Sequence, residues 1–322
     1  MFKSIKYHNF KVLRDTTLPL GRFNLVVGPN GSGKSTALQA LRFAALGQAI
    51  DVESVRSINA DDTPSGIAIE WNDGNLTTVQ WLRGGGIKQK NTRQDDEYFR
   101  RLPSIRFYGL AGEALAVPVQ LQPQMELAAN GTNLAGVLDR LRDTDPERFQ
   151  RLNTELMKWL PEFDQILFET PSAGMRQVLL RAKGSKRSIR AYDLSDGTLF
   201  ALAMLTMAYS SAPPPFVAIE EPERGIHPRL LRRVQDALYR LAYPESHNES
   251  RKPVQVVATT HSPLFLDLYR EHPEEIVVAE KLESEARFVR LVEKDNLKEL
   301  LEDAPLGDLW YSGILGGVPL ER

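Results

Sequence analysis

Residues 28–35 read Gly28-Pro29-Asn30-Gly31-Ser32-Gly33-Lys34-Ser35 and match G-x-x-x-x-G-K-[S/T], the pattern of a phosphate-binding loop. The apolar run at residues 23–27 (FNLVV) precedes it and predicts a buried strand of a sheet covered on both faces. An apolar helix is predicted over residues 35–46, ending at Gly47. A glycine-rich turn between a strand and a helix is the context that this motif requires, so we expect an α/β domain with a phosphate site at this junction.

Each position of the loop has a chemical reason. Gly31 and Gly33 allow positive φ and so bring backbone N–H groups onto phosphate oxygens. Lys34 supplies a positive charge to the β- and γ-phosphates, and Ser35 places a hydroxyl on Mg²⁺. The start of the helix adds its partial positive charge. We therefore predict ATP with Mg²⁺ as the cofactor pair, bound by the residues Asn30, Gly31, Ser32, Gly33, Lys34, Ser35 and Thr36.

Two adjacent carboxylates follow a second apolar run, in the stretch FVAIEEPE at residues 216–223. A strand beside the loop strand would deliver both side chains to the phosphate site. We expect Glu220 to serve the Mg²⁺ shell together with Ser35, and Glu221 to polarise the attacking water.

Two further motifs come from a helix start and a strand end. The stretch LSDGT at residues 194–198 precedes an apolar helix: Ser195 can cap it, and Gly197 leaves the backbone open to an anion. His261 follows the apolar strand at residues 254–258, at the edge of the sheet where ligands bind in open α/β folds. His261 could hydrogen-bond the γ-phosphate or the attacking water.

These four motifs, in this order, resemble the ATP-binding-cassette (ABC-type) ATPases. GPNGSGKS corresponds to the Walker A loop, LSDGT to the signature, FVAIEEPE to the Walker B strand and THS to the H-loop. The stretches EEPERGIHP and TTHSPLFLDL resemble the soluble branch, which includes DNA-repair ATPases, chromosome-maintenance ATPases and the ATPase part of overcoming-lysogenization-defect (OLD) nucleases. NGTNLAGVLDRL and LGDLWYSGILGGVP resemble compact AAA_21-like ATPases. A Q-loop glutamine is not assigned, since Gln80 and Gln89 both remain candidates.

The resemblance implies roles for these residues. Glu221 and His261 would be catalytic, and Glu220 stands where the family more often has Asp, so its contact with Mg²⁺ would run through water. The signature residues Ser195 and Gly197 would contact the γ-phosphate held by a second copy of the chain. The resemblance therefore implies an ATP-dependent head-to-tail homodimer.

The predicted fold class is α/β, a P-loop ABC-type nucleotide-binding domain with an inserted helical subdomain. We expect one domain over residues 1–322, with the insertion at about residues 110–160, because strands alternate with helices on both sides of that helical segment. Residues 66–82 predict a hairpin that turns at Asp73-Gly74, and residues 83–97 predict an exposed loop.

Composition excludes several classes of function. The 322 residues are 42% hydrophobic and 25% charged, which is ordinary for a globular protein. The absence of cysteine excludes disulfides, thiolate catalysis and Cys-ligated zinc. The first ten residues lack the apolar core of a signal peptide, and no apolar run is long enough for a bilayer. We expect a cytoplasmic protein with no membrane partner.

Nucleic-acid contact would need a local patch, because the net charge is -2. Two groups of cations qualify, and for each the alternative is an ordinary solvated surface. The first lies on a predicted hairpin that turns at Gly184-Ser185: Arg176, Arg181, Lys183, Lys186, Arg187 and Arg190. The second lies near three glycines: Arg83, Lys88, Lys90 and Arg93. DNA is thus a candidate partner.

Three hypotheses for function follow. The first is an ATP hydrolase that dimerises on ATP and drives or gates a DNA-acting partner, in a role such as defence against phage. The second is an ATP-gated switch or scaffold with little turnover, and the third is the cassette of a membrane transporter. Residues 262–322 are too few for the Toprim nuclease domain of OLD proteins. We therefore expect an effector or nuclease to be a separate chain.

Overall fold

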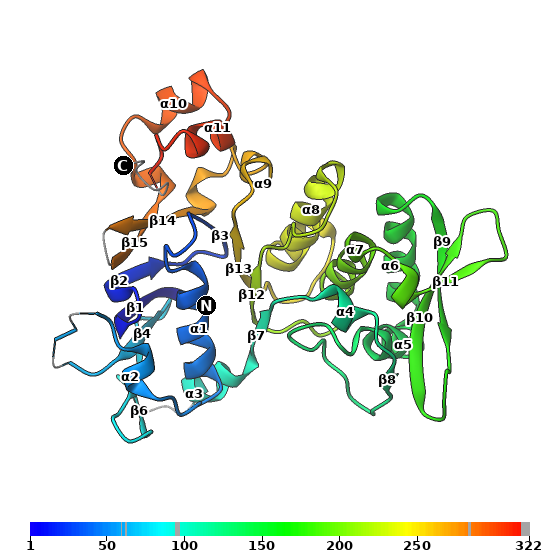
Figure 1. Cartoon of the computed structure of the whole chain (residues 1–322), viewed down its shortest axis with the longest axis horizontal. Helices are drawn as coiled ribbons and strands as arrows, with labels where there is room; N and C mark the ends of the chain where they lie inside the picture. Colours follow the sequence, from blue (N-terminus) through cyan, green and yellow to red (C-terminus); the bar gives the residue numbers. More distant parts are fainter. Residues whose placement is uncertain (59, 62, 94–96, 283–284, 317–322) are drawn as a thin grey trace. The chain divides into compact units, whose positions relative to one another are not determined.

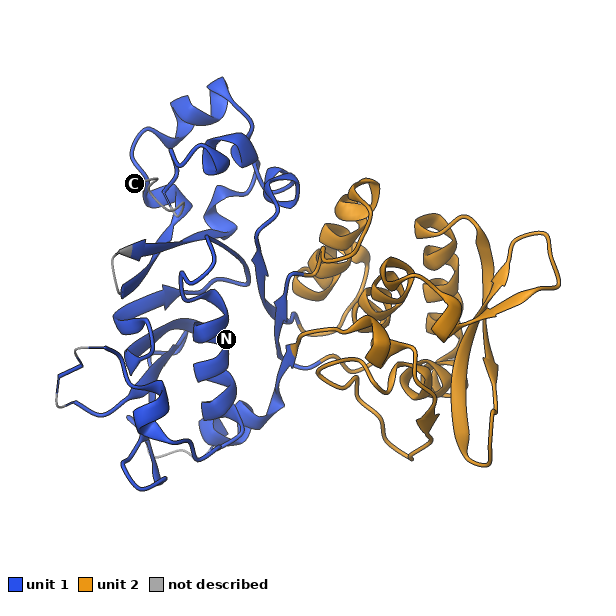
Figure 2. Cartoon of the chain, viewed as in Figure 1, with its two compact units in different colours: residues 1–107, 214–221, 253–322 blue, residues 108–213, 222–252 orange. Residues whose placement is uncertain are grey.

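The chain folds into two compact units, each formed by segments distant in sequence (Figure 2). Unit 1 contains residues 1–107, 214–221 and 253–322, and unit 2 contains residues 108–213 and 222–252. The computed structural model describes residues 1–58, 60–61, 63–93, 97–282 and 285–316. Within that range no helix is both long and apolar enough to cross a membrane.

A six-stranded sheet forms the centre of unit 1, in the order β15-β14-β3-β13-β12-β7 (Figure 1). Strands β14, β3, β13 and β12 pair in parallel, and β15 pairs antiparallel to β14. Every residue of β3 and β13 is buried, as expected for strands covered on both faces. Their bounds are β3 (Phe23–Val27), β7 (Ile105–Tyr108), β12 (Phe216–Glu220), β13 (Gln255–Thr260), β14 (Ile276–Leu282) and β15 (Glu285–Arg290).

A second sheet of unit 1 is antiparallel, in the order β2-β1-β4-β5-β6. Its strands are β1 (Phe2–Phe10), β2 (Leu13–Pro19), β4 (Gly66–Trp71), β5 (Leu76–Trp81) and β6 (Ile87–Asn91). The predicted hairpin over 66–82 is confirmed by the pairing of β4 with β5. The prediction that 83–97 is an exposed loop was wrong in part, because β6 pairs with β5, and residues 94–96 of that range lie outside the described residues. The exposed side chains of Lys88 and Lys90 on this edge strand discourage pairing with another chain. The charged residues in this range are therefore typical of an edge strand and not only of a loop.

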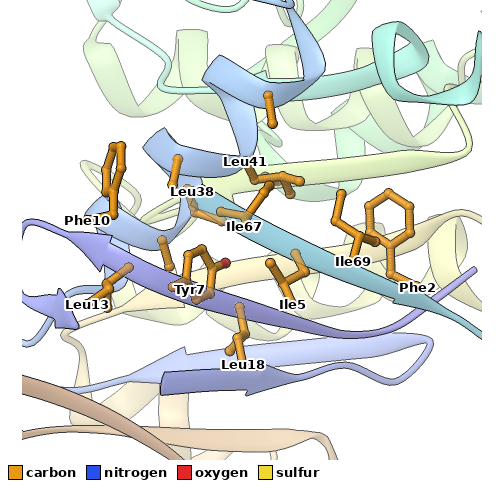
Figure 3. Packing of buried hydrophobic residues seen from close by; sticks show 14 of the residues in the cluster. Phe2, Ile5, Tyr7, Phe10, Leu13, Leu18, Leu38, Leu41, Ile67 and Ile69 are labelled. Carbon is orange, nitrogen blue, oxygen red and sulfur yellow. The ribbon is translucent and has the colours of Figure 1, made fainter. Parts of the chain in front are cut away.

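Helix α1 (Lys34–Ala45) packs against this antiparallel sheet through one apolar face (Figure 3). Leu38 and Leu41 lie with Tyr7 and Ile67 in the main hydrophobic cluster. The helix that follows the phosphate-binding loop is therefore anchored in the core. The other α-helices described in unit 1 are α2 (Val52–Val55), α3 (Glu97–Arg101), α9 (Pro263–Asp267), α10 (Leu297–Asp303) and α11 (Leu306–Tyr311).

Unit 2 combines helices with a small antiparallel sheet in the order β11-β10-β8, with β9 also paired to β10. Its elements are α4 (Gly112–Leu115), β8 (Val119–Gln120), α5 (Leu134–Thr144), α6 (Pro146–Trp159), β9 (Phe163–Glu169), β10 (Met175–Ala182), β11 (Ser188–Arg190), α7 (Asp196–Ala208) and α8 (Leu231–Ala242). The helical segment expected at about 110–160 lies in this unit. Asp145 caps α6 by accepting a hydrogen bond from the Arg148 amide.

Candidate functional site

The phosphate-binding loop joins β3 to α1 in unit 1 and has the backbone that its glycines predict. Gly31 and Gly33 have φ of 75° and 91°, values that favour glycine. A Cβ on Gly28 would lie 2.4 Å from the Ala279 carbonyl oxygen, and one on Gly33 would lie 2.8 Å from Leu13 Cδ2. Both conformation and close packing therefore require glycine here, which keeps the loop near the backbone of β3 and β14.

Lys34 lies inside this loop rather than in solvent. Its side chain is buried, and Nζ donates hydrogen bonds to the carbonyl oxygens of Gly28 (2.8 Å) and Pro29 (2.9 Å). Burial lowers the pKa of Lys34 to about 8, and the negative charges of Glu221 and Glu220 oppose that shift. A phosphate would supply the countercharge that the buried ammonium lacks, and its oxygens could take the place of the two carbonyls.

The remaining loop residues leave the start of α1 open to an anion. No side chain caps the helix at Gly33, and its first turn has no acidic residue. Asn30 and Ser35 are exposed and Thr36 is half-buried. Ser32 is buried, and its Oγ has no hydrogen-bond partner within the described part of the chain. Free polar groups at a helix start are the arrangement that binds phosphate in proteins.

The carboxylates stand at the end of β12, one strand further from the loop than the sequence suggested. β12 pairs with β13, and β13 pairs with β3, so the prediction that the acidic strand lies directly beside the loop strand was wrong. Glu220 is exposed at the strand end. Glu221 follows with φ of 46°, a left-handed conformation that is uncommon for Glu, and its amide donates to the Thr259 carbonyl oxygen (3.1 Å).

His261 follows β13, which lies between the loop strand and the acidic strand. Its Nε2 lies 3.7 Å from Oε1 of Glu221. Burial lowers the pKa of His261, the charge of Lys34 adds to that effect, and Glu221 opposes it. A lowered pKa favours the neutral imidazole, which can donate one hydrogen bond and accept another. The structure thus brings Lys34, Glu221 and His261 together at the carboxyl ends of three adjacent parallel strands.

A Mg²⁺ ion at this site would have few protein side chains as ligands. Among the residues that the structure describes, no group of three or more His, Asp and Glu side chains could hold a metal ion. A Mg²⁺ site beside phosphates needs no such group, because the ion keeps several waters and takes one or two protein ligands. The hydroxyl of Ser35 at the start of α1 and the carboxylate of Glu220 after β12 are compatible with that donor set.

Two further residues near the site were given no role from the sequence. Thr259 is buried in β13 and accepts hydrogen bonds from the Glu221 amide through its carbonyl oxygen and, at 3.4 Å, through Oγ1. Lys281 lies on β14, and its Nζ would be 3.7 Å from a Cβ on Gly31. Both contacts depend on strand order, so only the TTHS stretch gave any indication of the first.

The signature residues lie in unit 2, whereas the loop, the carboxylates and His261 lie in unit 1. Ser195 caps α7, with Oγ accepting a hydrogen bond from the Thr198 amide at 3.2 Å. A Cβ on Gly197 would lie 2.6 Å from the Gly225 carbonyl oxygen, so close packing within unit 2 already requires this glycine. Gln80 and Gln89 lie on β5 and β6 of the antiparallel sheet, outside the sheet that carries the site.

The basic hairpin of unit 2 is partly neutralised. Arg181 pairs with Asp164 (2.6 Å) and Arg190 with Glu169 (2.8 Å). Arg176 likewise lies 3.0 Å from Asp139. The cations left around the turn are the exposed residues Lys183, Lys186 and Arg187. In the second group, Arg83 pairs with Glu53 and Arg93 with Asp73, which leaves Lys88 and Lys90 on β6.

Comparison with known proteins gives two family matches. Residues 76–267, more than half of the chain, match the family described as "AAA domain, putative AbiEii toxin, Type IV TA system". Residues 4–109 match a second family, described as "AAA domain". Together the matches include the antiparallel sheet, the phosphate-binding loop, the signature residues, the carboxylates and His261.

One curated relative is similar over a short stretch. A protein of Thermus scotoductus named OLD nuclease is 49% identical over 41 residues. The stretch covers 13% of this chain and 8% of that protein, so the likeness concerns a small part of each.

Solved structures similar to this chain include head domains of Smc proteins. An Smc head bound to the C-terminal winged-helix domain of ScpA has a TM-score of 0.63 and 15% identity, and the match covers 89% of this chain and 96% of that one. An Smc head with an extended coiled coil, from Pyrococcus furiosus, has a TM-score of 0.60 and 15% identity, and the match covers 94% of this chain and 98% of that one. An Smc head with a coiled coil from Pyrococcus yayanosii has a TM-score of 0.59 and 12% identity, and the match covers 94% of this chain and 99% of that one. At this identity the likeness concerns the fold, and it confirms the predicted α/β class.

Proposed function

The chain belongs to the ATPase family that its residues 76–267 match, and we propose that residues 30–36, Glu221 and His261 form its ATP-hydrolysing site. The observation that carries this proposal is the grouping of Lys34, Glu221 and His261. Lys34 is held on the loop carbonyls, and Glu221 lies 3.7 Å from His261 on the ends of neighbouring strands.

The side chains suggest a division of labour in phosphoryl transfer. Lys34 stabilises negative charge on the transferred phosphate, since its buried ammonium has no full countercharge. Glu221 orients and deprotonates the attacking water as general base. Neutral His261, beside Glu221, donates a hydrogen bond to the phosphate or fixes the water. A Mg²⁺ ion held by Ser35, and by Glu220 through water, would neutralise phosphate charge.

Dimerisation on ATP supplies the remaining phosphate contacts. In this proposal Ser195 and Gly197 of one chain meet the γ-phosphate held by Lys34 of a second chain, which makes a head-to-tail homodimer. Ser195 already lies at the start of α7, where its small hydroxyl and the nearby amides suit an anion. Hydrolysis then weakens the contact between the chains.

A separate effector is the proposed target of this cycle. The family description names a toxin of a toxin–antitoxin system, one relative is a nuclease, and a similar Smc head binds a domain of ScpA. These findings support an ATPase that drives or gates a DNA-acting partner chain, in a role such as defence against phage. The alternative, a switch with little turnover, predicts a hydrolysis rate that stays low with DNA and with the partner.

Replacing Lys34 tests the nucleotide site directly. Lys34→Ala should weaken ATP binding by about 10- to 100-fold, because a charge-assisted contact contributes about 1.5–3 kcal/mol. The measurement is titration of a fluorescent ATP analogue in the presence of Mg²⁺. Lys90→Ala, which removes an exposed lysine from β6, is the matched control and should bind like the parent. Parental affinity in Lys34→Ala would exclude the loop as the nucleotide site.

DNA binding by the hairpin turn is tested with a pair of variants. Lys183→Ala with Lys186→Ala should weaken binding and reduce the slope of log affinity against log salt by about 2, because each lysine on a phosphate contributes about 1. Lys88→Ala with Lys90→Ala removes the same charge from β6. Fluorescence anisotropy over a salt series makes the comparison. If both double variants lose DNA affinity equally, or if the parent does not bind DNA at low salt, the hairpin is an ordinary solvated surface.

A further inference from the structure

A second concentration of positive charge lies wholly within unit 2, in a cavity of about 650 Å³. Its wall is formed by one face of α6, by Tyr209 after α7, by the end of α8 and by residues 247–251. None of the residues that line the cavity belongs to the nucleotide site proposed above. Five cationic side chains but only two carboxylates line the cavity: Arg148, Arg151, Lys158, Arg240, Arg251, and Glu155 and Glu249.

Three of the arginines converge on a single carboxylate. Glu249 accepts from Arg240 at 2.5 Å and from Arg251 at 2.6 Å. Arg148 lies 3.5 Å from the same carboxylate and also pairs with Asp145 at 3.0 Å. The three arginine side chains are only 16%, 12% and 16% exposed, in the order Arg240, Arg251, Arg148. Positive charge therefore exceeds negative charge in a place with little water, which is costly unless an anion joins it.

Electrostatics at Arg251 agree with this excess. Burial lowers the pKa of Arg251, Glu249 opposes that effect, and the charges of Arg148 and Arg240 lower the pKa further. Glu249 has a larger effect on Arg251 than either neighbouring guanidinium, so the carboxylate offsets part of the repulsion among the three arginines. A bound anion would offset the part that remains.

The outer wall adds two exposed cations, Arg151 and Lys158. Arg151, Thr154 and Lys158 occupy one exposed face of α6, three and four residues apart, while Leu152 and Leu156 are buried on the opposite face. Lys158 pairs with Glu155 at 2.8 Å and remains 55% exposed, and Arg233 also pairs with Glu155. Within the described residues no carboxylate pairs with Arg151.

We propose that this cavity binds a small ligand carrying several clustered phosphate groups, of the size of a tripolyphosphate or a nucleoside triphosphate. Guanidinium forks match phosphate oxygens in geometry and charge. The volume falls within the range of about 300–1,000 Å³ typical of small-molecule sites. The Tyr209 ring is buried and covered by the Arg240 guanidinium at 4.1 Å, so this site recognises phosphates rather than a stacked base.

Tripolyphosphate is the probe, and the full chain carrying Lys34→Ala is the parent, so that the phosphate-binding loop competes less for it. Calorimetric titration at physiological salt should give one saturable site. Adding Arg151→Ala and Lys158→Ala should weaken binding at least about tenfold, since each charge-assisted contact is of that order. Both side chains are exposed, so the variant should fold like the parent, as its melting temperature will verify. Glu155→Gln, which removes one of the two carboxylates, should instead strengthen binding.

The control removes equal charge elsewhere in unit 2, with Lys183→Ala and Lys186→Ala on the hairpin turn, and should bind tripolyphosphate like the parent. Inorganic phosphate and a short single-stranded DNA form the other arms of the titration. A parent that does not bind tripolyphosphate would overturn the proposal. Equal weakening in the control would overturn it as well, and so would binding of DNA alone, because the cavity would then serve a nucleic-acid backbone.

Discussion

Glu221→Gln should bind ATP like the parent but hydrolyse it about 10²–10⁴-fold more slowly, the usual effect of losing a general base. Gln keeps the size of the side chain, so the left-handed backbone at residue 221 and its hydrogen bond to Thr259 should persist. The substitution removes the carboxylate that accepts the proton from water, and with it the negative charge near His261 and Lys34. Single-turnover measurement of phosphate release, paired with equilibrium binding of ATP, separates chemistry from affinity.

Glu220→Gln is the matched control for this prediction. Glu220 ends β12 one residue earlier, is exposed, and would act on Mg²⁺ through water, so its loss should chiefly raise the Mg²⁺ concentration needed for half-maximal rate. If Glu221→Gln hydrolyses ATP at the parental rate, the general base is His261 or Glu220 instead. Measuring His261→Ala and Glu220→Gln by the same assay would then identify it.

Local sequence was enough to place the functional side chains on their elements. The loop at 28–35 requires a strand before it and a helix after it, and both form, with Gly31 and Gly33 at positive φ. Runs such as FNLVV and FVAIE are continuous because both faces of the parallel sheet are covered, which also places the following polar residues at one edge. These features depend on neighbours in the chain, so a single sequence contains them.

Strand order was not available from the sequence. The insertion of β13 between β3 and β12 is a pairing over more than two hundred residues, and it explains why His261 rather than Glu221 follows the strand next to the loop strand. The same limit applies to the basic hairpin. Asp164 and Glu169 on β9 neutralise two arginines of that hairpin because β9 and β11 both pair with β10 in these registers.

Clusters built from several elements were equally hidden. Arg148 is 101 positions from Glu249 in the sequence and belongs to no motif, yet it lies 3.5 Å from the carboxylate that Arg240 also contacts in unit 2. Gly197, by contrast, belongs to a motif. Packing against the Gly225 carbonyl oxygen already leaves no room for a side chain at this position. A motif therefore gives the chemistry that a residue can perform, while packing can supply an independent reason for the same residue.

Closure of the ATP-dependent dimer is the second large effect, and Glu221→Gln is the variant that should reveal it. With hydrolysis blocked, ATP·Mg should convert the chain from monomer to dimer, because binding free energy that exists only in the closed state shifts the equilibrium toward it. Multi-angle light scattering with and without saturating ATP·Mg measures the change of mass. An unchanged mass would exclude ATP-driven closure and leave a monomer or a constitutive oligomer.

Adding Ser195→Arg should keep ATP binding but block that closure, since a bulky cation replaces the small hydroxyl at the start of α7. Loss of the cap on Thr198 costs about 1 kcal/mol, so the fold should survive, and its melting temperature will show it. Ser195→Asp retains a cap and instead repels the γ-phosphate, so it should block closure without that cost. Ser185→Arg, on the exposed hairpin turn of the same unit, is the matched control and should still dimerise. If both Ser195 variants close with ATP as the control does, the signature loop has no part in the dimer, and the phosphate held by Lys34 must be recognised by other residues.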